Sequence, residues 1–475
     1  MSAPASDRTS LPQELCDLVL DDLALSNLDS KDARLSDLKA CSLVSKGWRM
    51  RAAGHLFKSI TLPSPAFSEV KWTTKDDNML STEQEAELAM QAMVKLRDAV
   101  QPGGILSSTS NIVFYVRHIT LNFLSSIDIL EKALPLLQQI PFAPNQLRGI
   151  ALDKVILIPS FLSYLSSLLL NNNDSIERLS FHELVLTTHG FSKGLSLIDE
   201  LAMISNIFPP LPNLEHLYIR DINLDHALES GTSQDYNDSL TTDISARLPR
   251  PSPKAITLDI DADLGAFLLG EFLFSPDRAV FDLADTEELN LTHYEYELNA
   301  HSRVLLGAEA SLRKFSIRVC KKAGAHRSHF YAPSRDTIRR DTEIINHLHR
   351  KAPNLTHVAA FLELQYYRTE QFIRGLPEIK NLQSLQAVDI RVEAIVADGS
   401  KTESDANWDL VKSRLTQLDE SLEKLSLETV SDSFMEIGVV ITVKEASLEL
   451  SKSIVDSCFS RMKSRSSPRF RLVTL

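Results

Sequence analysis

Several features that would point to enzyme chemistry are scarce in this sequence. Only 15 of its 475 residues are glycine, and the glycine-rich nucleotide motifs, the Gly-x-Ser-x-Gly hydrolase motif and the His-Glu-x-x-His metal motif are all missing. The histidines, 13 in number, have no cysteine or carboxylate beside them at ligand spacing. We therefore expect no catalytic residues, no metal and no cofactor, and we expect that the chain is not an enzyme.

Cysteines and long apolar runs are also few. The four cysteines are Cys16, Cys41, Cys320 and Cys458. They lie far apart, so we expect buried apolar side chains rather than zinc ligands or disulfides. The most apolar windows, 161–170 and 265–274, reach about half of the roughly 20 residues that a membrane helix needs. No secretory signal is visible, and the sequence predicts a cytoplasmic or nuclear protein without a membrane partner.

Basic residues are in deficit. The chain has 50 of them against 63 acidic residues, which gives a net charge of −13. Most of such a surface would repel a polyanion, so nucleic acid is not an expected partner. The hydrophobic share of 43% and the charged share of 24% are typical of globular proteins, and the length suits two or three domains or one long array.

The first 62 residues have a helical pattern of their own. Ser10 and Pro12 are typical of a helix start. The apolar residues that follow fall at helical spacing: Leu15, Leu18, Val19 and Leu23. A second set repeats every three or four residues: Leu35, Leu38, Cys41, Val44 and Trp48. The two sets predict a small helical domain over residues 1–62.

Three segments of this domain resemble the fungal type of the F-box family. They read LPQEL from Leu11, CSLVSKGWR from Cys41 and HLFKSITL from His55. The resemblance implies a three-helix F-box over residues 1–62 that docks on the Skp linker subunit of a cullin-RING ubiquitin ligase. Carried over by position, it implies a Skp contact made by Leu11, Pro12, Leu15, Leu38, Leu43, Val44 and Trp48. By the helical pattern alone, an ordinary helical cap with these residues as core is the alternative.

A six-residue unit, apolar-x-x-apolar-x-apolar, recurs through the rest of the chain. It begins at Val116, Leu147, Ile176, Leu214, Pro253, Thr286, Leu312, Leu355, Leu385 and Leu422. The mean period is about 34 residues, with gaps from about 26 to about 43. Alternation within each unit predicts a short strand, and the 3.6-residue period between units predicts helices at 127–139, 160–170, 196–207, 336–350 and 408–418.

One strand and one helix per repeat resemble a leucine-rich-repeat solenoid. The sequence thus predicts an α/β protein, with the F-box followed by an irregular solenoid of short parallel strands and helices over residues 112–475. A helical array or an ordinary α/β domain is the alternative. Residues 63–111 are predicted to be a linker with an amphipathic helix at 83–100.

Three polar segments are predicted to lie outside the repeats. Residues 229–253 form a polar, proline-ended insertion that is predicted to be disordered, and residues 397–406 form a smaller one. The basic segment 461–471 is predicted to be a solvated tail rather than a nucleic-acid contact.

One aspartate pair is the best candidate for metal chemistry. Asp259 and Asp261 end a predicted strand, and such a pair can hold Mg²⁺ in phosphohydrolases or sugar-nucleotide transferases. The residue after Asp263 is Leu264, where a calcium loop needs glycine. An alternating strand that points both carboxylates to solvent explains the pair more simply.

The alternation also predicts one open sheet face, because strands covered on both faces would be apolar throughout. The residues expected to contact a target protein on this face are Arg178, His182, His216, Tyr218, Arg220, Lys314 and Arg318. Lys424, Ser426 and Glu428 continue the row, and Tyr218 with Arg220 is the expected anchor, since aromatic residues and arginine dominate binding hot spots.

Together these patterns favour a substrate-recognition subunit of an SCF-type ubiquitin ligase. Its partners would be Skp, through Skp a cullin, and an unknown target protein. A repeat scaffold outside any ligase is the first alternative. A Mg²⁺-dependent hydrolase or transferase that uses Asp259 and Asp261 is the remote one.

Overall fold

The computed structural model divides the chain into two compact units, Met1–Ile176 and Glu177–Leu475, and each is described by itself. The residues described are 13–25, 31–62, 87, 90–91, 93–94, 97–98, 112–123, 127–186, 207–220, 223–224, 250–259, 280–293, 307–308, 310–319, 352–364, 367–377, 384–395, 401–428, 436–444, 448–464 and 469–475. Over these residues the protein is α/β, with parallel strands in both units. None of the helices in these ranges is long and apolar enough to cross a membrane.

The first unit begins with three helices, which we call the head. They are α1 (Gln13–Leu25), α2 (Lys31–Cys41) and α3 (Lys46–Leu56). Ser45 is the N-cap of α3, where its hydroxyl accepts the N–H of Trp48 at 3.3 Å. Gly47 lies against the side chain of Gln13, so the first turns of α1 and α3 are neighbours.

Short parallel strands follow the head in the same unit. They are β1 (Ser59–Leu62), β2 (His118–Asn122) and β3 (Gly149–Asp153), paired in chain order, with β4 (Ile156–Leu157) after them. A 3₁₀ turn, η1 (Ile112–Tyr115), precedes β2. The helices α5 (Ile127–Leu137) and α6 (Pro159–Asn171) confirm the predicted helical segments at 127–139 and 160–170.

The core of the first unit combines apolar packing with one buried polar cluster. The rings of Phe123 and Phe161 meet edge to face at 5.8 Å between centroids, and both are fully buried. Buried Asn172 accepts the backbone N–H groups of Gln146 and Leu147, each at 2.9 Å. This amide satisfies backbone donors that the core would otherwise leave unpaired.

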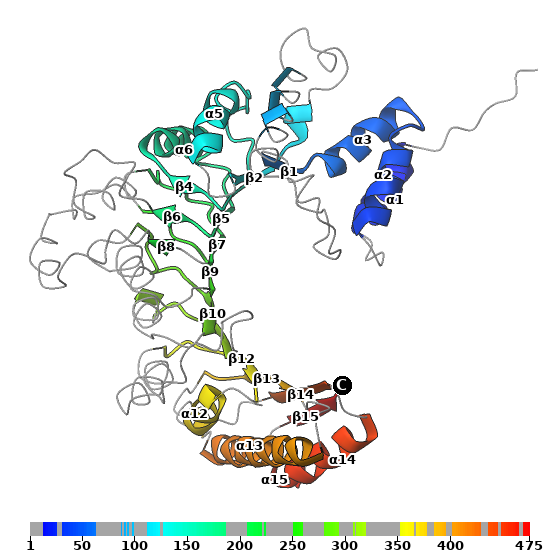
Figure 1. Cartoon of the computed structure of the whole chain (residues 1–475), viewed down its shortest axis with the longest axis vertical. Helices are drawn as coiled ribbons and strands as arrows, with labels where there is room; N and C mark the ends of the chain where they lie inside the picture. Colours follow the sequence, from blue (N-terminus) through cyan, green and yellow to red (C-terminus); the bar gives the residue numbers. More distant parts are fainter. Residues whose placement is uncertain are drawn as a thin grey trace, which may run out of the picture. The chain divides into compact units, whose positions relative to one another are not determined.

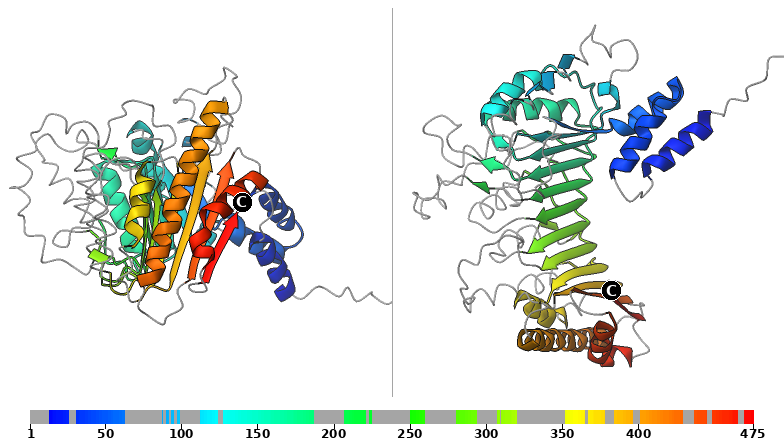
Figure 2. Two further views of the ribbon diagram at one scale, coloured as in Figure 1. Left: turned by 90° about the horizontal axis from the view of Figure 1, so that it is seen from below. Right: turned by 45° about the vertical axis from the view of Figure 1, so that its right-hand side comes forward.

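The second unit contains a long parallel sheet. In order across it, the strands are β5 (Arg178–His182), β7 (His216–Arg220), β9 (Ala255–Asp259), β10 (Glu288–His293), β11 (Lys314–Val319), β12 (His357–Glu363), β13 (Ala387–Ile395), β14 (Glu436–Lys444) and β15 (Arg469–Thr474). Each pairs with the next in parallel, and Figure 2 shows the resulting ladder. Two further short strands, β6 (Val185–Leu186) and β8 (Asn223–Leu224), pair beside it.

The strand predictions are confirmed for nine of the ten repeat units. The units that begin at residues 116, 147, 176, 214, 253, 286, 312, 355 and 385 contain β2, β3, β5, β7, β9, β10, β11, β12 and β13. Each of these strands starts two residues after its unit does. The apolar positions in the strands are buried, and the residues between them are more exposed, as the alternation predicts.

The tenth unit was predicted wrongly. Its residues belong to α13 (Lys401–Glu428), so Lys424, Ser426 and Glu428 are helical and do not continue the row on the sheet. The buried residues of α13 repeat at helical spacing through the unit: Val411, Leu415, Leu418, Leu422 and Leu425. The spacing of Leu422 and Leu425 fits both patterns, and the longer helical run decides between them. The predicted helix at 408–418 lies inside α13.

Two predicted polar segments are corrected as well. The insertion at 397–406 is helical from Lys401 onward, because α13 begins there. The basic tail at 461–471 overlaps α15 (Ser460–Lys463) and the strand β15. Arginines alternate with apolar residues in β15, which is an edge strand. The segment was predicted to be a tail because it is basic.

Helices pack at the C-terminal end of the second unit (Figure 1). These are α12 (Tyr367–Gly375), α13, α14 (Leu448–Cys458) and α15, which lie beside β13–β15 in Figures 1 and 2. Phe459 is fully buried and stacks on Phe470 of β15 at 6.0 Å between ring centroids. These apolar contacts close the core at the last strands.

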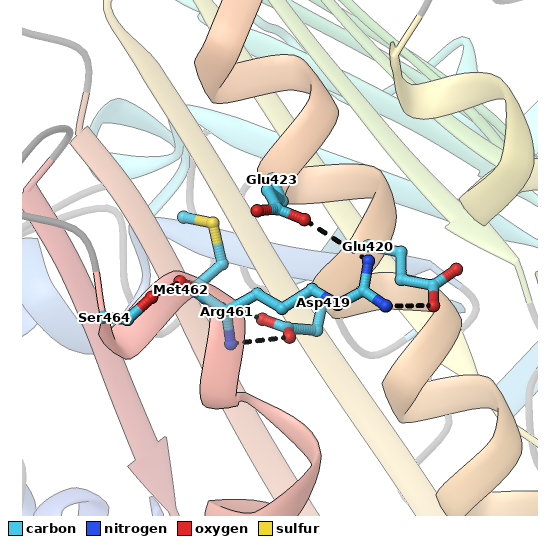
Figure 3. Close-up of polar contacts among 6 residues, drawn as sticks. All are labelled: Asp419, Glu420, Glu423, Arg461, Met462 and Ser464. Atoms are coloured by element: carbon cyan, nitrogen blue, oxygen red, sulfur yellow. Dashed lines mark hydrogen bonds and ion pairs between the residues drawn. The ribbon is translucent and has the colours of Figure 1, made fainter.

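A buried carboxylate joins α15 to α13 (Figure 3). Asp419 is 1% exposed and accepts the backbone N–H groups of Arg461 and Met462, both at 3.1 Å. The Arg461 guanidinium donates to Glu420 at 2.8 Å and to Glu423 at 3.4 Å. Burial raises the pKa of Asp419 above its usual value, and the two N–H donors oppose part of that shift.

Several predicted segments lie wholly or mostly outside the described residues. They are the helices at 83–100, 196–207 and 336–350 and the insertion at 229–253, of which only residues 250–253 are described.

Candidate protein-interaction surfaces

The head exposes an unusual number of large apolar side chains. In α1 these are Leu15, Leu18 and Val19, and Leu18 is 63% exposed. In the turn between α2 and α3, Leu43 is 78% and Val44 is 65% exposed. With Met50 of α3, these residues form what we call the exposed head set: Leu15, Leu18, Val19, Leu43, Val44 and Met50. An apolar surface that covers so many residues of three short helices is typical of a protein-binding site.

The interior of the head is small by comparison. Its buried apolar residues among those described are Cys16, Leu20, Leu38, Ala52 and Ala53. Cys16 and Leu20 lie one helical turn apart on α1, so α1 packs inside the head through this stripe. Of the stripe predicted from spacing, Leu15, Leu18 and Val19 are exposed and Leu23 is half-buried. Helix α1 therefore has two apolar stripes, of which one is buried inside the head and the other is exposed.

Part of the exposed head set lies at one end of the head. Gln13, in the first turn of α1, contacts Gly47 in the first turn of α3. Leu15 is two residues after Gln13, and Leu43 and Val44 directly precede the Ser45 cap of α3. The α2–α3 turn and the first turn of α1 therefore lie at the same end of the head.

A carboxylate of α1 forms an ion pair and hydrogen bonds with side chains of α3. Asp21 of α1 accepts hydrogen bonds from the guanidinium of Arg51, with Nε at 2.7 Å from Oδ1, and from His55 Nε2 at 2.8 Å. The Arg51 hydrogen bonds, followed by that of His55, lower the pKa of Asp21 to about 2. Asp21 is thus ionised in the folded head throughout the neutral range.

The predicted Skp-contact residues fall into three groups. Leu11 and Pro12 lie outside the described residues. Leu15, Leu43 and Val44 are exposed members of the exposed head set. Leu38 is 3% exposed and belongs to the interior, and Trp48 is half-buried in α3.

The sheet of the second unit has one face of alternating, less buried side chains, which we call the open face. All seven residues predicted to contact a target lie there, on three strands: Arg178 and His182 on β5, His216, Tyr218 and Arg220 on β7, and Lys314 and Arg318 on β11. The register places His182 beside Arg220, and Tyr218 contacts the His182 ring at 4.8 Å between centroids. The expected anchor pair of Tyr218 and Arg220 is therefore engaged with neighbouring side chains of the sheet.

A hollow of about 690 Å³ opens on the open face, across β10 to β14. Small side chains make the space: Ser316, Ala359 and Gly438 lie in one row of the register, and only Asp389 interrupts it. The next row carries larger groups, Arg318, Phe361, Arg391 and Val440, along the side of the hollow.

Only Arg318 among the predicted target residues lines this hollow. His357, Phe361, Asp389 and Arg391 were missed because target residues were chosen from other strands of the repeat series. Extending the same two-residue offset to the units at Leu355 and Leu385 would have placed all four on the open face. The sequence signal for these residues was present, but the two strands that carry them were not chosen.

The aspartate pair considered for metal binding is described only in part. Asp259 ends β9 and lies 3.7 Å from the guanidinium of Arg220, and Asp261 lies outside the described residues. Within the described ranges, no group of three or more His, Cys, Asp or Glu side chains could hold a metal ion. The Asp259 carboxylate thus has a basic neighbour on the adjacent strand.

No protein-family model and no curated protein matches the chain. A functional proposal must therefore come from the exposed head set, the open face and the hollow. The exposed head set is apolar, whereas the open face with its hollow carries polar and charged side chains.

Proposed function

We propose that the chain is the substrate-recognition subunit of an SCF-type ubiquitin ligase. In this proposal the head is an F-box that docks on a Skp-type protein, and the sheet of the second unit is a leucine-rich-repeat-like body that binds a target protein. Cullin is then reached through Skp, and the chain itself carries out no covalent step.

The exposed head set is the observation that carries this proposal. The three short helices leave Leu18, Leu43 and Val44 more than half exposed, while their own interior is built on few residues. Burying one leucine or valine side chain is worth about 1.5–3 kcal/mol, so docking would stabilise the head and the complex together. Leu15, Leu43 and Val44 are also positions that the F-box resemblance assigns to the Skp contact.

The parallel, sequential strands support the second half of the proposal. Each strand adds one row of side chains to the open face, as in a stacked-repeat protein that binds a partner along its length. The role of such a subunit is proximity. It holds a target lysine near the charged ubiquitin-conjugating enzyme and raises the effective concentration of the reacting groups.

The direct test is a pull-down of the purified full chain with Skp. In the variant Leu43→Asp/Val44→Asp, two exposed side chains become charged, so the fold should survive and the contact should not. Hot-spot losses of about 2–4 kcal/mol each predict that Skp binding falls by well over tenfold.

Leu170→Asp is the matched control, because Leu170 is 64% exposed on α6, outside the head. Circular dichroism should show that all three proteins are folded. Equal capture of wild type and the double variant, or no capture of folded wild type, would reject the F-box assignment. The open face and its hollow would then favour a repeat scaffold that binds proteins outside a ligase.

A further inference from the structure

The lining of the hollow on the open face carries two arginines, Arg318 and Arg391, against one carboxylate, Asp389. Arg318 and Arg391 lie two strands apart in the same row, with Phe361 between them. Among the residues that the structure describes, neither guanidinium forms an ion pair, and both are exposed. The protein as a whole has a net charge of −13, so two unpaired arginines in one hollow are a local exception.

The aromatic ring between them restricts the position of the Arg318 side chain. The Arg318 guanidinium lies over the Phe361 ring, with Cζ at 4.6 Å from the ring centroid. Stacking uses the flat face of the guanidinium and leaves its N–H groups, which lie in the plane, available to a ligand. Because the ring restricts the arginine, less side-chain entropy is lost when an anion binds.

The acidic side chain in the lining of the hollow contacts a histidine of the same lining. Asp389 lies 3.3 Å from His357 Nε2, its neighbour on β12. Gly438 makes room for this carboxylate, since a Cβ at that position would lie 2.5 Å from Asp389 Oδ1. Asp389 lies in the row of Ser316 and Ala359, so the row of Arg318 and Arg391 has no carboxylate from the described lining of the hollow.

The dimensions of the hollow suit an extended peptide. It crosses five strands, which at about 4.8 Å per strand is a span of roughly 19 Å. An extended chain covers that distance in about six residues. Ser316 and Ala359 keep the floor low enough for backbone to approach, and Phe361 and Val440 supply apolar contact beside the charges.

We propose that this hollow binds an extended acidic segment of the target protein, with a carboxylate between Arg318 and Arg391 and an apolar side chain against Phe361. The proposal rests on the target-binding half of the proposed function and needs nothing from Skp. A carboxylate is favoured because a planar guanidinium pairs with it through two parallel hydrogen bonds. The charge of the site thus selects the chemistry of the partner.

The test uses the immobilised full chain and a phage-displayed library of random peptides of about ten residues, longer than the span requires. Selected peptides should be enriched in Asp or Glu beside an apolar residue. Synthetic copies should bind in a fluorescence-anisotropy titration, and their affinity should fall as salt is raised. Replacing each acidic residue by its amide should weaken binding about tenfold or more.

The variant Arg318→Gln/Arg391→Gln should lose binding of the same peptides by about tenfold to a hundredfold. Arg313→Gln is the matched control, because Arg313 is an exposed arginine of the second unit that precedes β11 and does not line the hollow. The double variant should still capture Skp as wild type does. If wild type does not capture Skp, the F-box assignment is rejected, but the binding of acidic peptides to the hollow is unaffected.

Three results would overturn the proposal. One is a selection without acidic enrichment, or without any binder that depends on the hollow. Another is equal binding of the acidic peptides to wild type and to Arg318→Gln/Arg391→Gln. The third is binding of phosphoserine peptides with none of their glutamate counterparts, which would show that the site requires a phosphate rather than a carboxylate.

Discussion

The head and the sheet of the second unit present opposite surfaces. The head exposes leucines and valines over a small interior, whereas the sheet buries its apolar residues and presents charged and polar ones. Ile390, Val439 and Ile441 are each at most 1% exposed, while Leu43 of the head is 78% exposed. Apolar docking contributes to the stability of the part that docks, but a charged hollow on a complete core contributes selectivity. We therefore expect the head to depend on its partner more than the sheet does.

The largest expected effect on stability comes from truncating one buried side chain in the sheet and one in the head. Ile390→Ala, in the middle of β13, should lower the free energy of unfolding of the second unit by about 2–5 kcal/mol. Leu20→Ala, in the head, should fall in the lower part of that range, because few neighbours surround the deleted group. Hydrogen exchange followed by mass spectrometry measures both, segment by segment.

The exchange pattern shows whether the head and the sheet open independently or together. If each variant speeds exchange only in its own unit, the head and the sheet open independently. If Leu20→Ala speeds exchange in β10–β14 as much as in α1–α3, the difference in dependence on a partner does not hold. Leu18→Ala is the control for the head, because Leu18 is exposed and its deletion opens no core.

Acid should affect the two regions in opposite directions. Asp21 has a pKa lowered to about 2 by Arg51 and His55, so its contribution to stability is present above pH 4 and is lost as the pH falls from about 4 to 2. Asp419 has a pKa raised by burial, so the folded form gains relative stability as the pH falls below that pKa, and its ionisation costs stability as the pH rises.

Denaturant titrations between pH 5 and pH 3, with exchange as the local readout, test this contrast. The head should be destabilised on acidification, and the contact between α13 and α15 should be spared. In Asp21→Asn the acid sensitivity of the head should be flattened, and Asp419→Asn should leave it unchanged. Acid loss of head stability that is identical in Asp21→Asn and wild type would remove Asp21 as its cause.

How far the fold follows from sequence differs between the regions too. Apolar alternation was strong enough to place β2, β3, β5, β7 and β9 to β13, because burial on one face imposes a period of two. The unit at Leu422 failed because six residues cannot distinguish that period from a helix when Leu415 and Leu418 precede it. β14 and β15 were missed since neither follows a unit of the repeated form.

In the head, spacing found the helices but not their orientation. Leu15, Leu18 and Val19 are at helical spacing, and so are Cys16 and Leu20 on the adjacent stripe. Sequence alone gives no reason to choose between two apolar stripes, because tertiary packing decides which one is buried. The hollow was equally hidden, since it depends on Gly438 of β14 lying beside Asp389 of β13, a contact between residues 49 positions apart.

The smallest expected effect concerns the hollow. Phe361→Leu keeps an apolar side chain but removes the ring under Arg318, and a cation–π contact is worth about 0.5–1 kcal/mol at an exposed site. Acidic peptides selected on wild type should bind this variant about two- to fivefold more weakly. Anisotropy titrations measure it, and Phe114→Leu, exposed and outside the hollow, is the control. Unchanged affinity would show that Arg318 binds without being ordered by the ring.

The constant offset between repeat unit and strand has a consequence for divergence. In β5, β7 and β9 to β13, each strand starts two residues into its unit, although the spacing between units ranges from about 26 to about 43 residues. Parallel pairing sets the neighbour of each strand, so the length of the connection does not enter the register. Connections can therefore lengthen, shorten or change composition in the course of evolution while the rows of the open face stay aligned.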